Sequence, residues 1–210
     1  MLQVKSLAYE YKNKKVLEDI SFELSSGSVL GIVGPNGSGK TTLITLLATN
    51  KKELTGSIKH TMEKGPLVIG YIPQEIALFS ELTVLDNFRI FGKIKNEKDQ
   101  LFKRIISALG LEEQLNIKVS KLSGGTKRRV NIGVELVRDP QFIYMDEPIV
   151  GIEYSIREQI VALIEELAKE GKIIVIASHN IDFLRKTCSQ LLKLDLGKNV
   201  YFGEYNDDIL

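Results

Sequence analysis

One stretch of the sequence, residues 29–48, constrains the fold more than any other part of the chain. An apolar run, Val29–Val33, leads into a glycine-rich turn, and helix-forming residues follow from Lys40 to about Ala48. A buried strand that enters a helix through a tight glycine turn is the local unit of a parallel α/β sheet. The sequence therefore predicts an α/β fold with parallel strands at its centre.

The glycine-rich turn matches the pattern G-x-x-x-x-G-K-[ST], the phosphate-binding P-loop. Its glycines let backbone N–H groups approach phosphate oxygens, and the following helix points its positive N-terminal end at the same anion. Lys40 can place its ammonium near the β- and γ-phosphates of a nucleotide, and Thr41 can offer a hydroxyl to Mg²⁺. The candidate nucleotide-binding residues here are Gly34, Pro35, Asn36, Gly37, Ser38, Gly39, Lys40, Thr41 and Thr42.

A second apolar strand, expected at Phe142–Met145, runs directly into Asp146 and Glu147. The carboxyl end of a buried strand lies at the rim of an α/β sheet, where ligands bind. Downstream of a P-loop, Asp146 is a candidate to hold Mg²⁺ through water, and Glu147 is a candidate general base for the attacking water. Without the P-loop, two exposed acids at the end of a strand would be the simpler interpretation.

A third motif, Leu122–Thr126, contains a serine and two glycines at the start of a helix that we expect over Gly124–Arg138. This helix end, formed by Ser123, Gly124 and Gly125, would make a second anion site. Taken alone, the pattern favours an ordinary helix cap. Together with the P-loop, it gives the chain two phosphate-binding helix ends but one P-loop.

In this order, the P-loop, Gln74, residues 122–125, the acidic pair and His179 resemble the nucleotide-binding domain of ATP-binding cassette (ABC) proteins over essentially the whole chain. The resemblance implies that two such domains pair head to tail, with each ATP held between the P-loop of one and the signature helix of the other. The partner would be a second copy or a paired ABC ATPase subunit. This pairing accounts for the second anion site, which would serve the partner's ATP.

The resemblance also implies a P-loop NTPase sheet core with an N-terminal antiparallel β subdomain and an inserted helical lobe. It implies one domain, residues 1–210, in which 1–74 and 140–210 form the sheet parts and about 75–139 form the lobe with the signature helix. The remaining strands are expected at 2–11, 16–24, 67–72, 173–177, 191–195 and 199–202, and the remaining helical segments at 82–115, 155–170 and 181–187.

Further site roles are implied by the resemblance alone. Tyr11 matches the aromatic residue that stacks on adenine, although Tyr9 is an alternative and a tyrosine packed on the strand surface is another. Gln74 matches the glutamine that contacts Mg²⁺ and the attacking water and links to the helical lobe. His179 matches the histidine that contacts the γ-phosphate. His60 matches no family position, and we expect it to be exposed.

Two positions depart from the usual family pattern. Thr126 stands where glutamine is common in the signature motif, and Glu153 stands where aspartate is usual in the loop after the catalytic pair. By resemblance, that loop crosses the dimer interface beside the catalytic water. Neither departure removes a catalytic group, and both bear on the geometry of the interface.

Composition excludes several classes of protein. The chain has 28 basic and 27 acidic residues, so it lacks the positive charge that nucleic-acid binding requires, and we expect no nucleic-acid partner. Lys127–Arg129, the one cluster that suggests such a partner, is expected to be a solvated helix face. Cys188 is the only cysteine, which excludes an intrachain disulfide, fits a cytosolic protein and predicts an inert thiol on a helix.

The apolar runs, such as Val29–Val33 and Ile173–Ala177, have only the length of strands, whereas a membrane-spanning helix needs about 20 apolar residues. The N-terminal residues also lack the pattern of a signal peptide. If the chain works at a membrane, another polypeptide must cross it. The regions 126–133 and 147–152 resemble exporter ATPases that act on separately encoded membrane subunits, which implies a cytoplasmic protein bound peripherally to an integral membrane permease.

The sequence therefore predicts a transport-coupled ATPase whose cofactors are ATP and Mg²⁺. Residues 76–91 are expected to contact the permease, and they include Phe79, Leu82 and Phe88, which look exposed; the core of the helical lobe is the alternative for some of them. The competing function is that of a soluble ABC ATPase not linked to transport. A third possibility is an ATP-gated module that does not hydrolyse ATP, and the presence of Glu147 and His179 argues against it.

Overall fold

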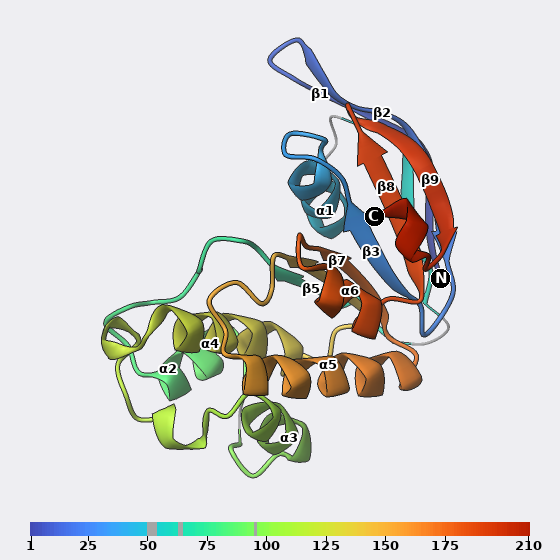
Figure 1. The fold of residues 1–210 in the computed structure, drawn as a ribbon. Coiled ribbons are helices and arrows are strands. Elements are labelled where there is room, and N and C mark those ends of the chain that lie inside the picture. The colour runs from blue at the N-terminus through green and yellow to red at the C-terminus, as the bar shows by residue number, and fades with distance from the viewer. Residues whose placement is uncertain (50–53, 63–64, 95) are drawn as a thin grey trace.

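The chain folds around one curled sheet of nine strands (Figure 1). The fold is known from a computed structural model, which describes residues 1–49, 54–62, 65–94 and 96–210. The sheet has the order β4-β1-β2-β9-β8-β3-β7-β6-β5. Its strands are β1 (Leu2–Tyr11), β2 (Lys14–Leu24), β3 (Val29–Val33), β4 (Thr55–His60), β5 (Ile69–Ile72), β6 (Phe142–Asp146), β7 (Ile173–Ala177), β8 (Gln190–Asp195) and β9 (Lys198–Glu204).

The sheet has a parallel half and a largely antiparallel half. β3 pairs in parallel with β7 and β8, and β7, β6 and β5 continue the parallel arrangement. β1 pairs in antiparallel fashion with β2 and β4, and β8 forms an antiparallel hairpin with β9. The two halves also meet at a parallel pairing of β2 with β9, between Glu18 and Lys198. The carboxyl ends of β3, β6 and β7 therefore lie at one edge of the sheet.

Six helices flank this sheet within the described ranges. They are α1 (Lys40–Thr49), α2 (Val84–Ile90), α3 (Gln100–Ala108), α4 (Gly124–Leu136), α5 (Tyr154–Lys169) and α6 (Ile181–Thr187), and three short 3-10 turns lie at Glu112–Gln114, Val119–Lys121 and Asp207–Ile209. α1 lies inside the curl of the sheet, and α5 and α6 lie on its other face (Figure 1). α2, α3 and α4 form a lobe beside β5.

The central strands are buried on both faces, which explains their unbroken apolar sequences. All five residues of β3 and of β7 are buried. Successive side chains of a strand point to opposite faces, so neighbouring residues enter different cores. Val29 and Ile174 pack in the core that includes α5, whereas Leu30 and Val175 pack in the core around α1. This double burial fixes the rim of the sheet where the P-loop and the acidic pair emerge.

The fold confirms the predicted α/β class but differs from the sequence expectations in its details. β4 was not predicted because its polar sequence buries only Ile58. The helical segment expected over 82–115 consists of two separate helices, α2 and α3, which begin at the side-chain caps Thr83 and Asp99. Phe88 was expected to be exposed, and this was wrong, because it is fully buried and packs edge-on against Phe102 in the lobe.

His60, the last residue of β4, is not exposed as expected, because its ring packs against aromatic side chains of β6. Its Nε2 lies 2.6 Å from the hydroxyl of Tyr144, and its ring meets that of Phe142 edge-on at 4.7 Å. Burial lowers the pKa of His60 to about 4, with a smaller contribution from the N-terminal ammonium. Burial also raises the pKa of Tyr144 well above its ordinary value, so a neutral hydroxyl and a neutral imidazole share this hydrogen bond.

Two further observations concern the surface and the single thiol. Cys188 directly follows α6 and is free and buried, and burial raises its pKa to about 12.

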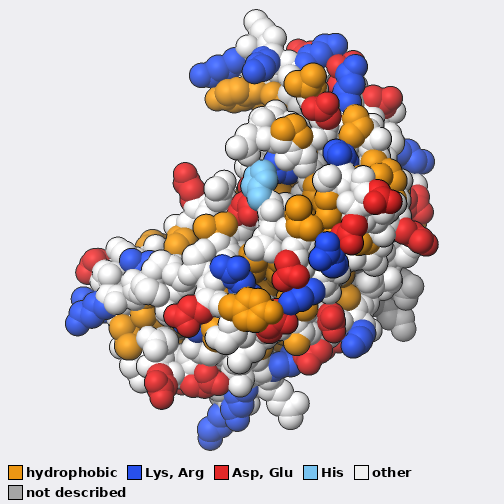
Figure 2. Space-filling model, viewed as in Figure 1, with side chains coloured by type: hydrophobic (Ala, Val, Ile, Leu, Met, Phe, Trp, Pro, Cys, Tyr) orange, Lys and Arg blue, Asp and Glu red, His pale blue; other side chains and the backbone are white. Residues whose placement is uncertain are grey.

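The face in Figure 2 is hollowed between the β1–β2 hairpin and the helical lobe, and basic side chains gather at the hairpin tip. Within the described part of the chain, no helix combines the length and apolarity needed to cross a membrane.

Candidate functional site

The P-loop joins β3 to α1 and folds back over the side chain of Lys40, the first residue of that helix. The Nζ of Lys40 donates to the carbonyl oxygens of Gly34 at 2.8 Å and Pro35 at 3.0 Å. Burial lowers the pKa of Lys40, and the negative charges of Glu147 and Asp146 partly counteract this effect. The ammonium is therefore held over the loop, on the side that faces the two acids.

Two glycines of the P-loop could not be any other residue without moving the backbone. Gly34 has a φ of 145°, and a Cβ there would lie 2.1 Å from the carbonyl oxygen of Leu194. Gly39 has a φ of 103°, and a Cβ there would lie 2.6 Å from the Cδ2 of Leu17. Both positions need a conformation that favours glycine and a close approach to a neighbouring strand. The sequence pattern thus reflects a loop pressed tightly onto the sheet.

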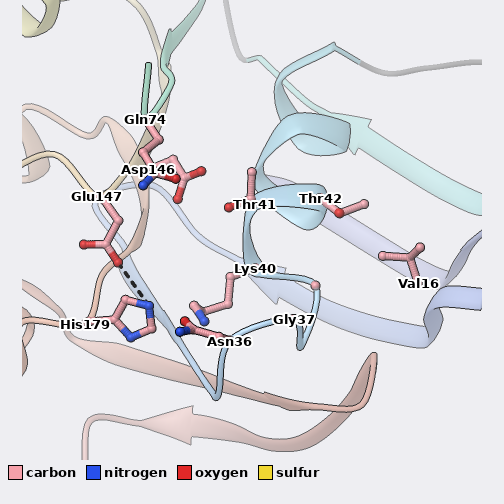
Figure 3. A pocket seen from close by; sticks show the side chains of 11 residues that line it. Val16, Asn36, Gly37, Lys40, Thr41, Thr42, Gln74, Asp146, Glu147 and His179 are labelled. Atoms are coloured by element: carbon pink, nitrogen blue, oxygen red, sulfur yellow. Dashed lines mark ion pairs between the residues drawn. The ribbon is translucent and has the colours of Figure 1, made fainter. Parts of the chain in front are cut away.

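A pocket of about 340 Å³ lies between the P-loop and the carboxyl ends of the parallel strands. In Figure 3, the side chains of Asp146 and Glu147 lie across this pocket from Lys40 and Thr41, and Gln74 enters beside Asp146. The structure thus brings together most of the residues predicted for the site. The pocket is lined by Val16, Asn36, Gly37, Gly39, Lys40, Thr41, Thr42, Gln74, Asp146, Glu147 and His179.

Asp146 ends β6 as a buried acid that lines the pocket. Its residue is 2% exposed, and its Oδ2 is a buried atom without a hydrogen-bond partner among the described residues. A buried carboxylate oxygen without a donor is costly unless a ligand or cation completes it. Asp146 is therefore suited to hold a hard cation in this pocket.

Glu147 follows in an unusual backbone conformation that directs its carboxylate. Its φ is 48°, in the left-handed region, and its N–H donates to the carbonyl of Ala177 at 2.8 Å. Its Oε2 accepts a hydrogen bond from Ser178 Oγ at 3.1 Å, and its Oε1 lies 3.6 Å from the Nε2 of His179 (Figure 3). Left-handed backbone is uncommon outside glycine and asparagine and marks positions under functional constraint.

Sequence reasoning missed Val16, which lines the pocket, Ser178, which bonds to Glu147, and Arg128, which lies behind the acidic pair. We expected Lys127–Arg129 to be a solvated face, and this was wrong, because Arg128 is 3% exposed and bonds to the backbone around the acidic pair. A signal was present in the sequence. Arg128 stands four and eight residues before Ile132 and Leu136, which are buried on α4, so helical periodicity aligns it with the buried stripe.

The signature motif begins α4 but does not line the pocket. Ser123 caps the helix, with its Oγ accepting from the N–H of Thr126 at 3.2 Å and lying 2.9 Å from the Thr126 hydroxyl. Ser123 and Gly124 are exposed, and a Cβ at Gly124 would meet no atom within 4 Å. The N-terminal ends of α1 and α4 lie well apart in Figure 1. The second helix end is therefore open to the outside of the chain.

Thr126 also contacts the second arginine of the cluster. Arg129 donates to the Thr126 hydroxyl at 3.0 Å and to the carbonyls of Leu109 and Gly110, so it too is no solvated side chain. Thr126 thus replaces glutamine with a short hydroxyl that is fully engaged inside the helix start. Glu153, the other departure, is the N-cap residue of α5 and makes no side-chain capping bond.

The aromatic residue expected at the adenine is exposed at the end of β1. Tyr11 is 58% exposed and does not line the pocket, and the Nζ of Lys12 lies 5.4 Å from its ring centroid. Its alternative, Tyr9, is buried, so Tyr9 has no free face for a base. Of the hairpin residues, Val16 reaches the pocket.

Comparison with known proteins decides the family. The family model described as ABC transporter matches residues 17–150. The chain belongs to this family. The resemblance predicted from the motifs is confirmed, and this ABC ATPase is the ATP-binding subunit of a transporter and an ATP hydrolase.

Two relatives and one solved structure illustrate the likeness of this ABC ATPase. The linearmycin resistance ATP-binding protein LnrL of Bacillus subtilis (strain 168) is 32% identical, covering 99% of this chain and 70% of that protein. Nod factor export ATP-binding protein I of Cupriavidus pinatubonensis (strain JMP 134 / LMG 1197) is 29% identical, covering 99% and 67%. The dimeric post-hydrolysis structure of the ATP-binding cassette MJ0796, bound to ADP and Pi, shares the fold with a TM-score of 0.81 at 24% identity, covering 98% and 99%.

Proposed function

We propose that this ABC ATPase hydrolyses Mg-ATP at the interface of a head-to-tail dimer and thereby drives export through a separate integral membrane permease. The observation that carries the proposal is the open N-terminal end of α4. Ser123 and Gly124 offer an anion-binding helix end that faces out of the chain and takes no part in its own pocket. A second chain, or a paired ABC ATPase subunit, would bring its own nucleotide to this end.

Within one chain, the pocket would bind the triphosphate and activate water. The P-loop amides and Lys40 would bind the phosphates, while Thr41, Gln74 and Asp146 would hold Mg²⁺. The unpartnered Oδ2 of Asp146 fits that assignment. The described residues contain no group of three or more His, Cys, Asp or Glu side chains suited to a metal, so phosphate and water oxygens would complete the shell. Bound Mg²⁺ would neutralise charge that develops on the phosphate oxygens.

Water activation would fall to the residues beyond β6 and β7. Glu147 would accept the proton of the attacking water, since its carboxylate lines the pocket. His179, 3.6 Å from that carboxylate, would contact the γ-phosphate as an imidazole. Gln74 would orient the water from its place beside Asp146 (Figure 3). Tyr11 would stack on adenine at the exposed hairpin, and Gly125 would complete the signature site.

The proposed permease contact lies on the lobe side of Gln74. A groove of about 300 Å³ there is lined by residues of β5, the following loop and α4, including Tyr71, Ala77, Phe91 and Glu135. Beside it, Phe79 is 51% exposed and stacks on Phe91 with ring centroids 5.1 Å apart. An apolar groove next to a catalytic loop suits a segment of a partner that must sense hydrolysis. Phe88, being buried, is withdrawn from this contact.

The direction of transport is proposed from the relatives. One is a Nod factor export protein and another is a linearmycin resistance protein, and both match nearly the whole of this chain. An exporter subunit acting at the cytoplasmic face of a membrane, through a separate permease, accounts for both likenesses. The substrate itself is a property of the permease.

Co-purification tests the proposed partner. The chain is co-expressed with a multi-spanning membrane protein encoded next to it, and the complex is isolated in detergent. We expect Phe79→Glu to abolish co-purification while the ATP affinity of the isolated chain stays within about 2-fold, since Phe79 does not line the nucleotide pocket. Val200→Glu, on an exposed residue of β9, is the matched control. Equal recovery of the membrane protein with Phe79→Glu and with the parent chain would contradict the proposed contact.

A further inference from the structure

We propose that Arg128 is a positioning residue for hydrolysis, which fixes the backbone at Glu147 and at Gln74 as one rigid unit. The inference rests on the proposed function, in which Glu147 activates water and Gln74 orients it. It assigns a role to a residue of the signature helix that contacts neither nucleotide site directly. Arg128 lies in the second turn of α4, between the signature end and the two catalytic loops.

The guanidinium of Arg128 uses all of its donors on backbone carbonyls of these loops. Nη1 donates to Pro73 O at 2.5 Å and to Gln74 O at 3.0 Å. On the other side, the carbonyls of the acidic segment accept from Nη2 and Nε: Asp146 at 2.5 Å, Glu147 at 2.9 Å and Pro148 at 3.2 Å. An arginine carries five N–H donors in a fixed plane, so these five bonds set the distance between the two loops.

Among the described residues, the negative charges that act on Arg128 are those of Asp146 and Glu147. Arg128 forms no salt bridge within the described ranges, although it is almost fully buried. Burial lowers its pKa, and the charges of Asp146 and Glu147 act in the opposite direction. A buried cation without a carboxylate partner is costly, and a cation kept only for folding is usually paired. Its placement behind the two acids instead ties its charge to the segment that carries them.

The bonds to Arg128 also explain how Glu147 keeps its left-handed backbone. The left-handed conformation, with φ at 48°, is unfavourable for a glutamate. The N–H of Glu147 is held by Ala177 O, and its carbonyl is held by Arg128. Without the bond from Arg128, the Glu147 carbonyl keeps only a longer bond from the N–H of Val150, at 3.5 Å, so the backbone that places the carboxylate beside Ser178 and His179 is less firmly held. Lysine would keep the charge, but three donors on one nitrogen cannot span the two loops.

The test is a double-mutant cycle between Arg128 and Glu147. We expect Arg128→Lys to lower kcat for ATP about 10-fold or more, the scale of a small misplacement of a catalytic group, with KM within about 2-fold. In the Glu147→Gln background, single-turnover hydrolysis of radiolabelled ATP should then fall by less than about 2-fold on adding Arg128→Lys. Residues that act through one another give such non-additive losses, whereas a general structural defect multiplies with the loss at Glu147.

A matched control separates positioning from stability. Lys172 is another buried cation, bonded to Asp139 Oδ1 at 2.5 Å just before β7 begins, at the opposite end of that strand from the pocket. Lys172→Met should lower the unfolding midpoint but leave kcat within about 2-fold. Arg128→Gln, which keeps two amide donors without charge, replaces Arg128→Lys if the lysine variant fails to bind ATP.

The outcomes decide between the two roles. Parent-like kcat in Arg128→Lys, or losses that multiply in the double variant, would overturn the positioning role. Loss of ATP binding in both Arg128 variants would do so as well, because it would make the residue purely structural. Parent-like turnover in Glu147→Gln alone would overturn the assignment of Glu147 within the proposed function. That failure is visible before Arg128 is changed, so it is distinguishable from failure of the present proposal.

Discussion

The two glycine-rich helix starts of this chain, at α1 and at α4, use the same local chemistry in opposite surroundings. Both present helix N-terminal N–H groups and a hydroxyl next to glycine. The start of α1 faces a pocket that already contains Lys40, Asp146 and Glu147. The start of α4, capped by Ser123, is exposed, and no residue of its first turn lines that pocket.

This difference teaches that an anion-binding helix end acquires its function from what faces it. At α1 the chain supplies a cation, Lys40, and two facing acids, which under the proposed function would hold the metal and act as the base. At α4 the helix N-terminus is exposed, and it does not face the pocket residues that lie opposite α1. Under the proposed function, the same motif would be a catalytic site in one place and half of an interface in the other. Four experiments can break or sharpen this distinction, and a further one probes a residue outside both helix ends.

The largest effect on ATP turnover is expected at Glu147, which lies across the pocket from the start of α1. Glu147→Gln keeps the shape of the side chain and loses the base, so turnover should fall about 10²-fold or more while ATP still binds. The ATP-bound dimer should accumulate, which light scattering with and without ATP would measure alongside steady-state hydrolysis. Turnover at the parent rate would remove Glu147 from the chemistry and leave the α1 end without its proposed base.

Mixing two inactive chains tests whether the α4 end serves another chain. Lys40→Ala disables the P-loop and Ser123→Ala disables the signature, and each homodimer should be nearly inactive. In the heterodimer one composite site lacks both groups and the other keeps both, so up to roughly half of the parent rate per dimer should return. Absence of any recovery, with heterodimers confirmed by mass, would mean that both ends act within one chain or that both sites must fire together.

Alanine substitutions at the two adjacent glycines at the start of α4 test how tightly this helix end packs against the rest of the chain. A Cβ at Gly125 would lie 2.3 Å from the carbonyl oxygen of Gly151, whereas one at Gly124 meets nothing within 4 Å. We expect Gly125→Ala to destabilise the isolated chain by about 1–3 kcal/mol, as overpacking does. Gly124→Ala should leave the unfolding midpoint nearly unchanged. Equal unfolding midpoints for the two variants would show that the loop at Gly151 moves aside at little cost in stability.

Acid should weaken the sheet without distinguishing the two helix ends, because His60 belongs to neither. Its folded-state pKa of about 4 lies below the ordinary 6.5, so its contribution to stability is complete above pH 6.5 and is lost as the pH falls towards 4. Allowing for its partial exposure, the loss at pH 5.5 should be about 1 kcal/mol. His60→Gln keeps an acceptor for Tyr144. In this variant the free energy of unfolding, measured with urea between pH 7 and 5, should depend less on pH. If the free energy of unfolding depends on pH equally in the variant and the parent chain, His60 is not the source of that dependence.

The smallest effect is expected next to the interface, at Glu153. Aspartate is a favourable N-cap residue, whereas Glu153 makes no capping bond to α5, so Glu153→Asp should stabilise the chain by about 0.5–1 kcal/mol. If the loop also contacts the partner, the shorter side chain should tighten ATP-driven dimerisation or raise turnover slightly. Calorimetry and hydrolysis assays would separate the two effects. A slower variant would indicate a local backbone adapted to glutamate.

The sequence predicted the α1 side of this comparison better than the α4 side. The P-loop and the acidic pair are local patterns, in which an apolar strand leads directly to the functional residues, and the structure assembles them in one pocket. Arg128 escaped because a charged residue near a helix start is usually solvated, and its burial depends on loops more than 50 positions before it and about 20 after it. β4 and His60 escaped because one buried residue, Ile58, gives no readable alternation.

Because Cys188 is buried, probes can be attached selectively to a cysteine introduced near the start of α1 or of α4. Labelling reagents react with the thiolate, and a buried thiol with a pKa of about 12 supplies almost none at neutral pH. Because the chain has no other cysteine, a single cysteine introduced on the surface would be the sole labelled position. Fluorescent or spin probes attached near α1 in one copy and near α4 in another could then report the approach of the two ends in real time, with the natural thiol left in place.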